Sequence, residues 1–176
     1  FNRSNYRGEN ILNKKYLLYG YGVSNRSVER FFIKKKINYQ ILKSSNDTIE
    51  NEDFDVIVKS PGIPFDDDFL LKHQNKLIIS DLELFSIFYP HAYIIGITGT
   101  KGKSTTSTLI YHLLKESGNN VILAGNIGIP ILDCVDDINE RTIVVYELSA
   151  HQLQFINKSP HVGILLNVFE EHLDHF

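Results

Sequence analysis

The chain has few of the features that mark secreted, membrane-bound or nucleic-acid-binding proteins. Its single cysteine, Cys134, excludes an internal disulfide, fits a reducing compartment and is best interpreted as a small core residue. No apolar run approaches the length of a bilayer-spanning helix, and no signal peptide is visible. The formal net charge of −3 and the scattered charges argue against a nucleic-acid surface. We therefore expect a cytoplasmic protein with no nucleic-acid partner and no membrane insertion.

Methionine is also absent, even at position 1, and the chain stops at Phe176 directly after a strand-like segment and a charged cluster. Both features suggest a piece of a longer natural protein. The 176 residues, 43% hydrophobic and 22% charged, suffice for one sizeable globular domain or two small ones.

Short apolar strands alternate with helical segments along the whole chain. The expected strands are 15–19, 39–42, 55–59, 77–79, 92–97, 120–123, 142–146 and 162–166. The expected helices are 24–36 (capped by Ser24), 65–74, 81–88 (capped by Ser80 or Asp81), 104–116 and 128–135. The pattern restarts after His91. It predicts an α/β protein with parallel sheets: a Rossmann-like domain at 1–91, followed by part of a P-loop NTPase-like domain at 92–176.

The most informative segment is Gly96–Thr105, which reads Gly-Ile-Thr-Gly-Thr-Lys-Gly-Lys-Ser-Thr between a strand and a helix. Backbone N–H groups of such a turn converge on phosphates, and Lys103 can reach the outer ones. Ser104 or Thr105 can offer a hydroxyl to Mg²⁺. The usual P-loop spacing is not kept, because Ile97 stands where the first glycine belongs. A glycine turn with an incidental lysine is the plainer alternative, but the ordered lysine and hydroxyls favour a nucleoside triphosphate.

Polar side chains follow the other strands of the second domain. Glu147 ends a buried strand, where P-loop proteins place an acid that holds Mg²⁺. Asn126 and Ser149 also follow strands and can line the same site. The cluster with His172 and Asp174 comes after the last strand and suits a second metal. A solvated glutamate, a structural histidine and a solvated acidic face are the alternatives.

The first domain carries a weaker signal. Gly20–Asn25 lies where a Rossmann fold has G-x-G-x-x-G, but Asn25 replaces the third glycine. The second strand ends in Lys43–Ser45 rather than in the acid that holds a ribose hydroxyl, which disfavours NAD. The turn still offers N–H groups to a phosphate or diphosphate. Ser60–Ile63 ends a strand at the same edge, with a simple turn as the alternative.

Taken together, these motifs resemble those of the Mur ligases of peptidoglycan synthesis. The likeness runs in order along nearly the whole chain from Tyr16 onward. The similar segments are Ser60–Gly62, Ser80–Phe85, Gly99–Thr105, Gly125–Pro130, Glu147–Leu153 and Asn167–Asp174. The Glu-Leu-Ser-x-x-Gln-Leu form of Glu147–Leu153 is most similar to the family member that adds D-glutamate.

The resemblance implies an ATP-dependent carbon–nitrogen ligase that adds D-glutamate to UDP-N-acetylmuramoyl-L-alanine through an acyl phosphate. It implies a UDP-sugar site in the first domain and a site for ATP and Mg²⁺ in the second. A C-terminal amino-acid-binding domain and a carbamylated lysine are expected beyond Phe176, and the Lys43–Ser45 loop departs from the family's more acidic form.

The same resemblance assigns roles to individual residues. Cofactor-binding residues would be Gly99, Thr100, Lys101, Gly102, Lys103, Ser104 and Thr105. Substrate-binding residues would be Val23, Ser24, Ser60, Pro61, Gly62, Asn126 and Ser149. Lys103, Glu147 and His172 would be catalytic; Ser104 and Glu147 would hold one Mg²⁺, and His172 the other.

Three alternatives stay open at this point. One is another Mur-type ligase, and a second is a folylpolyglutamate-type synthetase, against which a UDP-binding first domain argues. The third is a nucleotide-binding fragment without catalysis, because the isolated chain lacks the expected amino-acid domain and is expected to be inactive.

Overall fold

The structure is a computed structural model that describes residues 13–170, apart from 46, 50, 65, 154, 155 and 157. The chain divides into two compact units, the first ending at Phe88 and the second starting at Tyr89, with Ile156 assigned to the first. The sequence pattern puts the boundary after His91, and the roles given to the two domains stay predictions.

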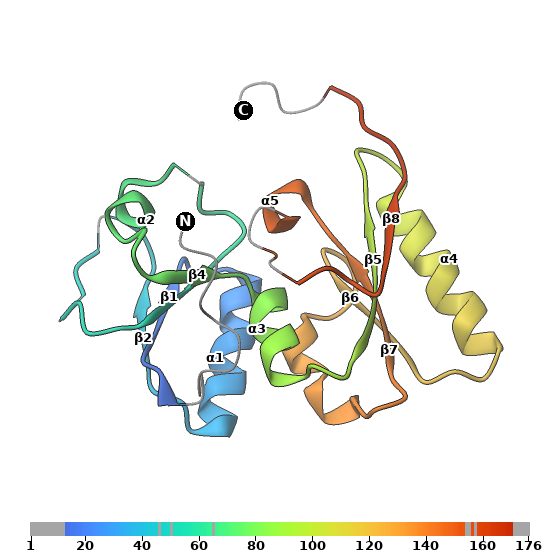
Figure 1. The fold of residues 1–176 in the computed structure, drawn as a ribbon, viewed down its shortest axis with the longest axis horizontal. Helices are drawn as coiled ribbons and strands as arrows, with labels where there is room; N and C mark the ends of the chain where they lie inside the picture. The colour runs from blue at the N-terminus through green and yellow to red at the C-terminus, as the bar shows by residue number, and fades with distance from the viewer. Residues whose placement is uncertain are drawn as a thin grey trace. The chain divides into compact units, whose positions relative to one another are not determined.

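The first unit contains a four-stranded parallel sheet of order β2-β1-β3-β4 (Figure 1). Its elements are β1 (Tyr16–Tyr19), α1 (Val23–Lys35), β2 (Tyr39–Leu42), β3 (Val56–Lys59), α2 (Asp68–Lys72), β4 (Leu77–Ile79) and α3 (Asp81–Phe88). Every residue of β1 and β3 is buried. Central parallel strands are covered on both faces, which explains their unbroken apolar sequences.

The second unit contains another four-stranded parallel sheet, of order β6-β7-β5-β8. Its strands and α-helices are β5 (Tyr93–Thr98), α4 (Lys103–Glu116), β6 (Val121–Gly125), β7 (Ile143–Glu147), α5 (Ala150–Leu153) and β8 (Val162–Leu165). The helix α4 packs against β5, β6 and β7. The predicted α/β class with parallel sheets is confirmed in both units.

The predicted helix near 128–135 is wrong. Two short 3₁₀ helices, Ile131–Asp133 and Val135–Asp137, follow an irregular turn instead. Gly128 has a φ of +81°, which an α-helix does not allow, and Pro130 brings no backbone N–H. Cys134 lies between the two turns, and burial together with nearby aspartates raises the pKa of its thiol to about 11. A protonated, buried thiol agrees with the expected core role.

The helix starts differ in part from the sequence pattern. α1 begins at Val23 with Gly22 at the cap, not Ser24, and no side chain caps it. α2 is shorter than expected and begins after Asp67, whose carboxylate accepts two backbone N–H groups of the first turn. α3 has the expected cap, since the Ser80 hydroxyl accepts the Glu83 N–H at 3.1 Å.

Asn25 stands at the position of the third glycine of the fingerprint, and its side chain connects α1 to two strands of the first unit. It is fully buried on α1. Its side-chain nitrogen lies 3.0 Å from the Tyr19 carbonyl oxygen and 2.7 Å from that of Gly20. The Val58 carbonyl oxygen is 3.0 Å away. One side chain therefore ties the start of α1 to the ends of β1 and β3.

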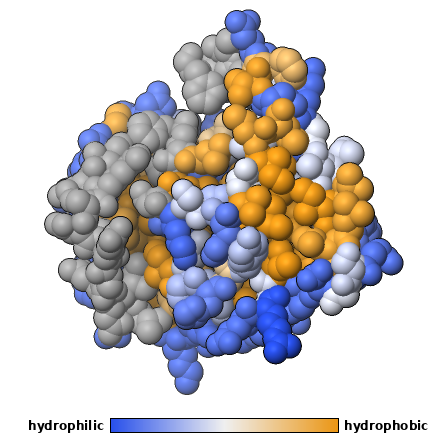
Figure 2. Space-filling view, turned by 45° about the vertical axis from the view of Figure 1, so that its right-hand side comes forward, coloured by the Kyte–Doolittle hydropathy of each residue, from blue (hydrophilic) through white to orange (hydrophobic). Residues whose placement is uncertain are grey.

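Exposed apolar side chains mark the second unit. Those on regular elements include Leu109 and Leu113 of α4 and Val162 and Leu165 of β8, and Figure 2 shows hydrophobic residues gathered in a patch. β8 ends the strand order, so one of its edges has no partner among the described strands. Within the described ranges, the helices fall short of the length and apolar character that a membrane crossing requires.

The Asn25 contacts give a first prediction. The change Asn25→Ala leaves three buried carbonyl groups without this donor, so we expect a loss of about 2–3 kcal/mol in the free energy of unfolding. Urea denaturation followed by circular dichroism measures it. Ile33→Ala, at an exposed position of the same helix, should cost less than about 0.5 kcal/mol. Equal losses for both variants would contradict the bracing role of Asn25.

Candidate functional site

The glycine loop between β5 and α4 has the backbone shape of an anion cradle. Gly99 and Gly102 have φ values of +143° and +85°, which other residues rarely adopt. Gly102 stands at the N-cap of α4, and no side chain caps this helix. The first turn of α4 therefore presents its N–H groups and partial positive charge to a ligand rather than to a capping side chain. Ser104 and Thr105 are exposed on this turn.

Lys103 folds back over the loop that precedes it. Its Nζ donates to the Gly99 carbonyl oxygen at 2.7 Å and to the Thr100 carbonyl oxygen at 3.0 Å. These bonds hold the ammonium group beside the loop that the sequence assigns to the phosphates. A positive charge fixed there favours an anionic ligand before one arrives.

Asn167, the second residue after β8, fastens the loop from the other side. Its side chain accepts the Lys101 N–H and donates to the Lys101 carbonyl, both at 2.9 Å. Its own carbonyl accepts the Thr100 N–H at 3.1 Å. A Cβ on Gly99 would lie 3.1 Å from the backbone of Asn167, so the close approach favours glycine. Asn167 lies in one of the segments that resemble the family, but the sequence alone assigns it no role. Its position directly after a strand was the only indication in the sequence that it lies near the loop.

Thr100 also joins the loop to the segment after β8. Its hydroxyl accepts the Phe169 N–H at 2.9 Å and donates to the Phe169 carbonyl at 3.3 Å. The chain that leads to His172 thus runs beside the loop as far as it is described. His172 and Asp174 lie outside the described residues, so their metal role stays a prediction. Within residues 13–170, apart from the gaps, no cluster of three metal-ligating side chains occurs.

Glu147 ends β7, the strand between β5 and β6. Its side chain is 1% exposed, and Oε1 accepts a hydrogen bond from the Asn126 side chain at 3.3 Å. Oε2 is buried and has no hydrogen-bond partner among the residues that the structure describes. A buried carboxylate oxygen without a donor is costly, and a hard cation such as Mg²⁺ would satisfy it. The donor at Glu147 therefore fits the predicted metal.

The segment after β6 wraps around the end of β7. Gly125 has a φ of +107°, and a Cβ there would lie 2.3 Å from the Glu147 carbonyl oxygen. The Asn126 N–H donates to that same oxygen at 3.1 Å. Glycine at 125 is thus required sterically, and Asn126 is held on Glu147 by both backbone and side chain.

Ser149 has a structural partner. Its N–H and hydroxyl donate to Gln152 Oε1 at 2.9 and 3.1 Å, and the Gln152 N–H donates to its hydroxyl at 3.3 Å. This reciprocal arrangement is a capping box that starts α5. The amide nitrogen of Gln152 contacts the Tyr146 hydroxyl at 3.3 Å. The predicted contact of Ser149 with substrate stays a prediction.

The two predicted diphosphate turns of the first unit pack against each other. Gly20 has a φ of +76°, and a Cβ on it would lie 2.8 Å from the Ser60 Cβ. A Cβ on Gly22 would lie 3.2 Å from the Ser60 hydroxyl. Val23 is 71% exposed at the start of α1, and Gly62 is exposed in the neighbouring turn. The structure therefore brings these candidates to one edge of the sheet.

Ser24 is half-buried and bonds to the carboxyl group of Asp81 at the start of α3. Burial raises the pKa of Asp81, while the bonds from Leu82 and Ser24 oppose this shift. The hydroxyl that the sequence offers to a diphosphate is thus already oriented by a buried acid.

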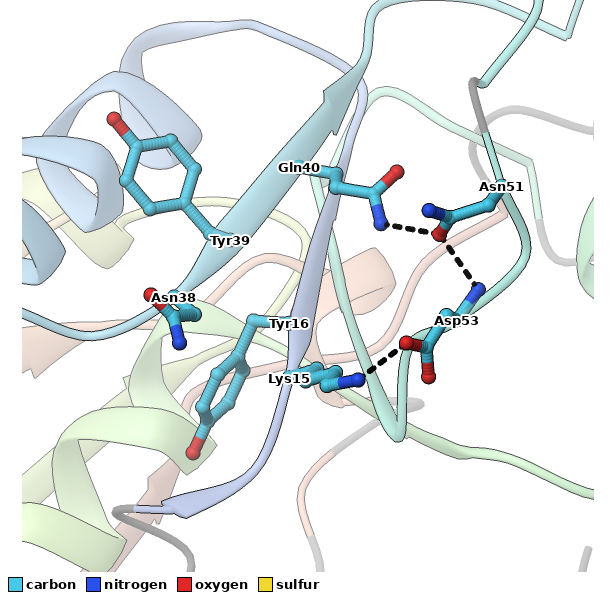
Figure 3. Close-up of a pocket in the computed structure, with 7 residues that line it drawn as sticks. All are labelled: Lys15, Tyr16, Asn38, Tyr39, Gln40, Asn51 and Asp53. Carbon is cyan, nitrogen blue, oxygen red and sulfur yellow. Dashed lines mark hydrogen bonds and ion pairs between the residues drawn. The ribbon is translucent and has the colours of Figure 1, made fainter.

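A separate pocket of about 210 Å³ lies in the first unit (Figure 3). Its lining residues are Lys15, Tyr16, Asn38, Tyr39, Gln40, Asn51 and Asp53. An ion pair joins Lys15 to Asp53 on its rim. These residues precede or begin β1, β2 and β3, whereas ligands of parallel sheets bind at the carboxyl ends of strands. We therefore do not assign this pocket to the candidate site.

Comparisons with known proteins find relatives of this chain. Residues 97–176 match the Mur ligase middle domain. The UDP-N-acetylmuramoylalanine–D-glutamate ligase of Acetivibrio thermocellus is 42% identical over 123 residues, 69% of this chain and 26% of that protein. The ligase of the same name from Clostridium acetobutylicum is 33% identical over 190 residues, 93% of this chain and 41% of that protein. The chain belongs to the Mur ligase family.

This Mur ligase chain spans less than half the length of those two relatives. Among solved structures, the UDP-N-acetylmuramate:L-alanyl-gamma-D-glutamyl-meso-diaminopimelate ligase from Neisseria meningitides is similar, with a TM-score of 0.54 and 16% identity. The match covers 93% of this chain and 63% of that one. This likeness supports the fold alone.

The Glu147 geometry gives a second prediction. Glu147→Gln removes the buried charge, so we expect an unchanged or higher melting temperature without metal. The variant should bind ATP with Mg²⁺ at least about tenfold more weakly, about 1.4 kcal/mol. Thermal shift with ATP, with and without Mg²⁺, measures both effects. Glu140→Gln, at an exposed loop position, is the control; a Mg²⁺ response of Glu147→Gln equal to this control would contradict the metal role.

Proposed function

We propose that this chain carries the sugar-nucleotide and ATP sites of a peptidoglycan ligase that adds D-glutamate to UDP-N-acetylmuramoyl-L-alanine. The observation that carries the proposal is the uncapped α4 loop together with the buried, unpartnered oxygen of Glu147. A phosphate cradle and a carboxylate in one unit are the parts that ATP and Mg²⁺ require. The two substrates come from the names of the relatives.

The first unit would hold the uridine diphosphate. Support comes from the packing of the Ser60–Gly62 turn against the turn that begins at Gly20. The exposed Val23 and the oriented Ser24 start α1 at this edge. The uncapped N-terminus of α1 adds backbone N–H groups for the diphosphate.

The reaction joins a carboxylate to an amine at the expense of ATP. The alanyl carboxylate attacks the γ-phosphorus of ATP, ADP leaves, and an acyl phosphate forms. The amine of D-glutamate then attacks the acyl carbon, loses a proton and releases phosphate. Phosphorylation is needed because a carboxylate oxygen is a poor leaving group at neutral pH.

The residues of the second unit would act on the phosphoryl group. The loop N–H groups and the Lys103 ammonium would bind the phosphates and oppose the charge that spreads over the transferring group. Ser104 and Glu147 would hold one Mg²⁺ and His172 the other, and bound Mg²⁺ supplies charge neutralisation at the phosphoryl oxygens. Asn126, held on Glu147, would face the muramoyl substrate.

No residue of this chain is assigned to D-glutamate. We therefore propose that the isolated chain binds the UDP-sugar and ATP without forming the amide. Calorimetric titration with each ligand, followed by a phosphate-release assay with D-glutamate, tests this. Binding of both ligands without turnover is the expected result. Failure to bind either one would overturn the proposal, as would turnover with a different amino acid by the full-length protein.

Lys103 provides a more specific prediction. Lys103→Met removes the ammonium from the loop, so ATP should bind about 100-fold more weakly, about 2.7 kcal/mol, while UDP-sugar binding is unchanged. Lys115→Met changes an exposed lysine in the last turn of the same helix and should leave both affinities as they are. If the two variants bound ATP equally well, Lys103 would have no role in the cradle.

A further inference from the structure

Lys59, the last residue of β3, is a buried lysine to which the ligase site assigns no role. Lys59 is only 3% exposed, although lysine is seldom fully buried. Its Nζ donates to the Ser60 carbonyl oxygen at 3.1 Å and lies 3.5 Å from that of Pro61. The ammonium therefore contacts the turn proposed to hold the diphosphate.

Two titratable groups of the described residues face Lys59. Asp67, the cap of α2, interacts with it electrostatically. Tyr19, beside Lys59 in the sheet, donates its hydroxyl to Asp67 at 2.7 Å. Burial lowers the pKa of Lys59 to about 8, and the Asp67 charge opposes this shift. Burial, and then the bond to Asp67, raises the pKa of Tyr19 well above its usual range, so this phenol stays protonated.

The contacts of Lys59 extend to the edge where the diphosphate would bind. Ser60 packs against Gly20, and its N–H donates to the Tyr19 carbonyl at 2.8 Å. Carbonyl oxygens that faced a diphosphate would repel it, and the Lys59 ammonium engages such oxygens instead. The turn is thus in contact with a charge that can be lost.

We propose that the protonated Lys59 positions the Ser60–Gly62 turn for the diphosphate of the UDP-sugar, so that binding is coupled to the protonation of Lys59. The inference rests on the proposed function of the first unit. Lys59 acts here through the turn, as a positioning residue, and not by touching the substrate.

The sign of the pH dependence follows from the lowered pKa. In the free protein the ammonium is charged below about pH 8 and is lost above it, so affinity should fall as pH rises through this value. Stability moves the other way. The unfolded chain keeps the Lys59 proton up to about pH 10.4, so the contribution of this group to stability rises with pH between the two values. Loss of affinity in this window is therefore not loss of fold.

Calorimetry of the whole chain with UDP-N-acetylmuramoyl-L-alanine tests the inference. Affinities are compared at about pH 7 and about pH 9 in two buffers of different ionisation enthalpy. The wild-type chain should bind roughly tenfold more weakly at the higher pH and take up close to one proton there. Lys59→Met should bind about tenfold more weakly than the wild type at pH 7. Its affinity should not show the fall between pH 7 and pH 9 that Lys59 causes, nor should its binding take up the corresponding proton. The ligand's own titration is common to both proteins and cancels.

Two further variants sharpen the test. Asp67→Asn keeps a good helix cap but removes the charge that supports the ammonium, so the fall in affinity should begin at a lower pH. Lys72→Met removes an exposed lysine of the neighbouring helix, paired with Glu52, and should behave as wild type. If circular dichroism shows that Lys59→Met does not fold, the inference is tested by the pH at which the affinity of Asp67→Asn begins to fall.

The outcomes separate the two proposals. UDP-sugar binding with the same pH profile and proton uptake in the wild type and Lys59→Met, or an unmoved profile in Asp67→Asn, overturns the role of Lys59 and leaves the proposed function intact. No binding by the wild-type chain overturns both.

Discussion

The contact between Asn167 and the glycine loop is the constraint on which the candidate nucleotide site depends. The asparagine bonds to both backbone groups of Lys101 and lies so close to Gly99 that a Cβ would crowd its backbone. This contact exists because β8 lies beside β5 in a parallel sheet, which brings the two strand ends to one edge. The loop is thereby held open in a shape suited to phosphates before any ligand binds. Because the loop is already ordered, less conformational entropy would be lost when a triphosphate binds.

Strand ends in the two units carry buried charges of opposite sign. Glu147 at the end of β7 has a carboxylate oxygen without a hydrogen-bond partner, and Lys59 at the end of β3 has an ammonium that burial disfavours. Such charges cost free energy in the free protein. Glu147 would meet Mg²⁺ with ATP, whereas Lys59 contacts the turn that is proposed to bind a diphosphate. The proposed function gives both buried charges a role.

The sequence predicted most of the fold, because its apolar strands are short, unbroken and followed by glycine or polar residues. The sequence also placed the glycine loop and Glu147 after strands of one sheet, which the pairing of β5 with β7 confirms. The sequence did not predict the features that depend on tertiary contacts. Asn25 contacts the Val58 carbonyl of β3 as well as the nearby carbonyls of Tyr19 and Gly20, and no local pattern indicates the contact with β3.

Other differences have the same origin. A helix near 128–135 looked plausible from composition, yet Gly128 in the left-handed region prevents it. Ser149 pairs with Gln152 at the start of a helix, a contact that the sequence did not indicate, and its substrate role stays a prediction. The sequence did not indicate that Lys59 is buried, because a lysine at the end of a strand is usually exposed to solvent. Glu147 ends a strand next to β5, as the sequence predicts, and the structure adds that its Oε2 has no hydrogen-bond partner among the described residues.

The central claim is that the glycine loop and Glu147 form a preorganised site for a nucleoside triphosphate. Its most direct test is amide NMR of the chain titrated with Mg²⁺ and a non-hydrolysable ATP analogue. We expect the largest shift changes at Gly99–Ser104, with smaller ones at Asn126 and Glu147 and none at Ser60. Shift changes centred on the first unit, with the loop amides unmoved, would contradict it.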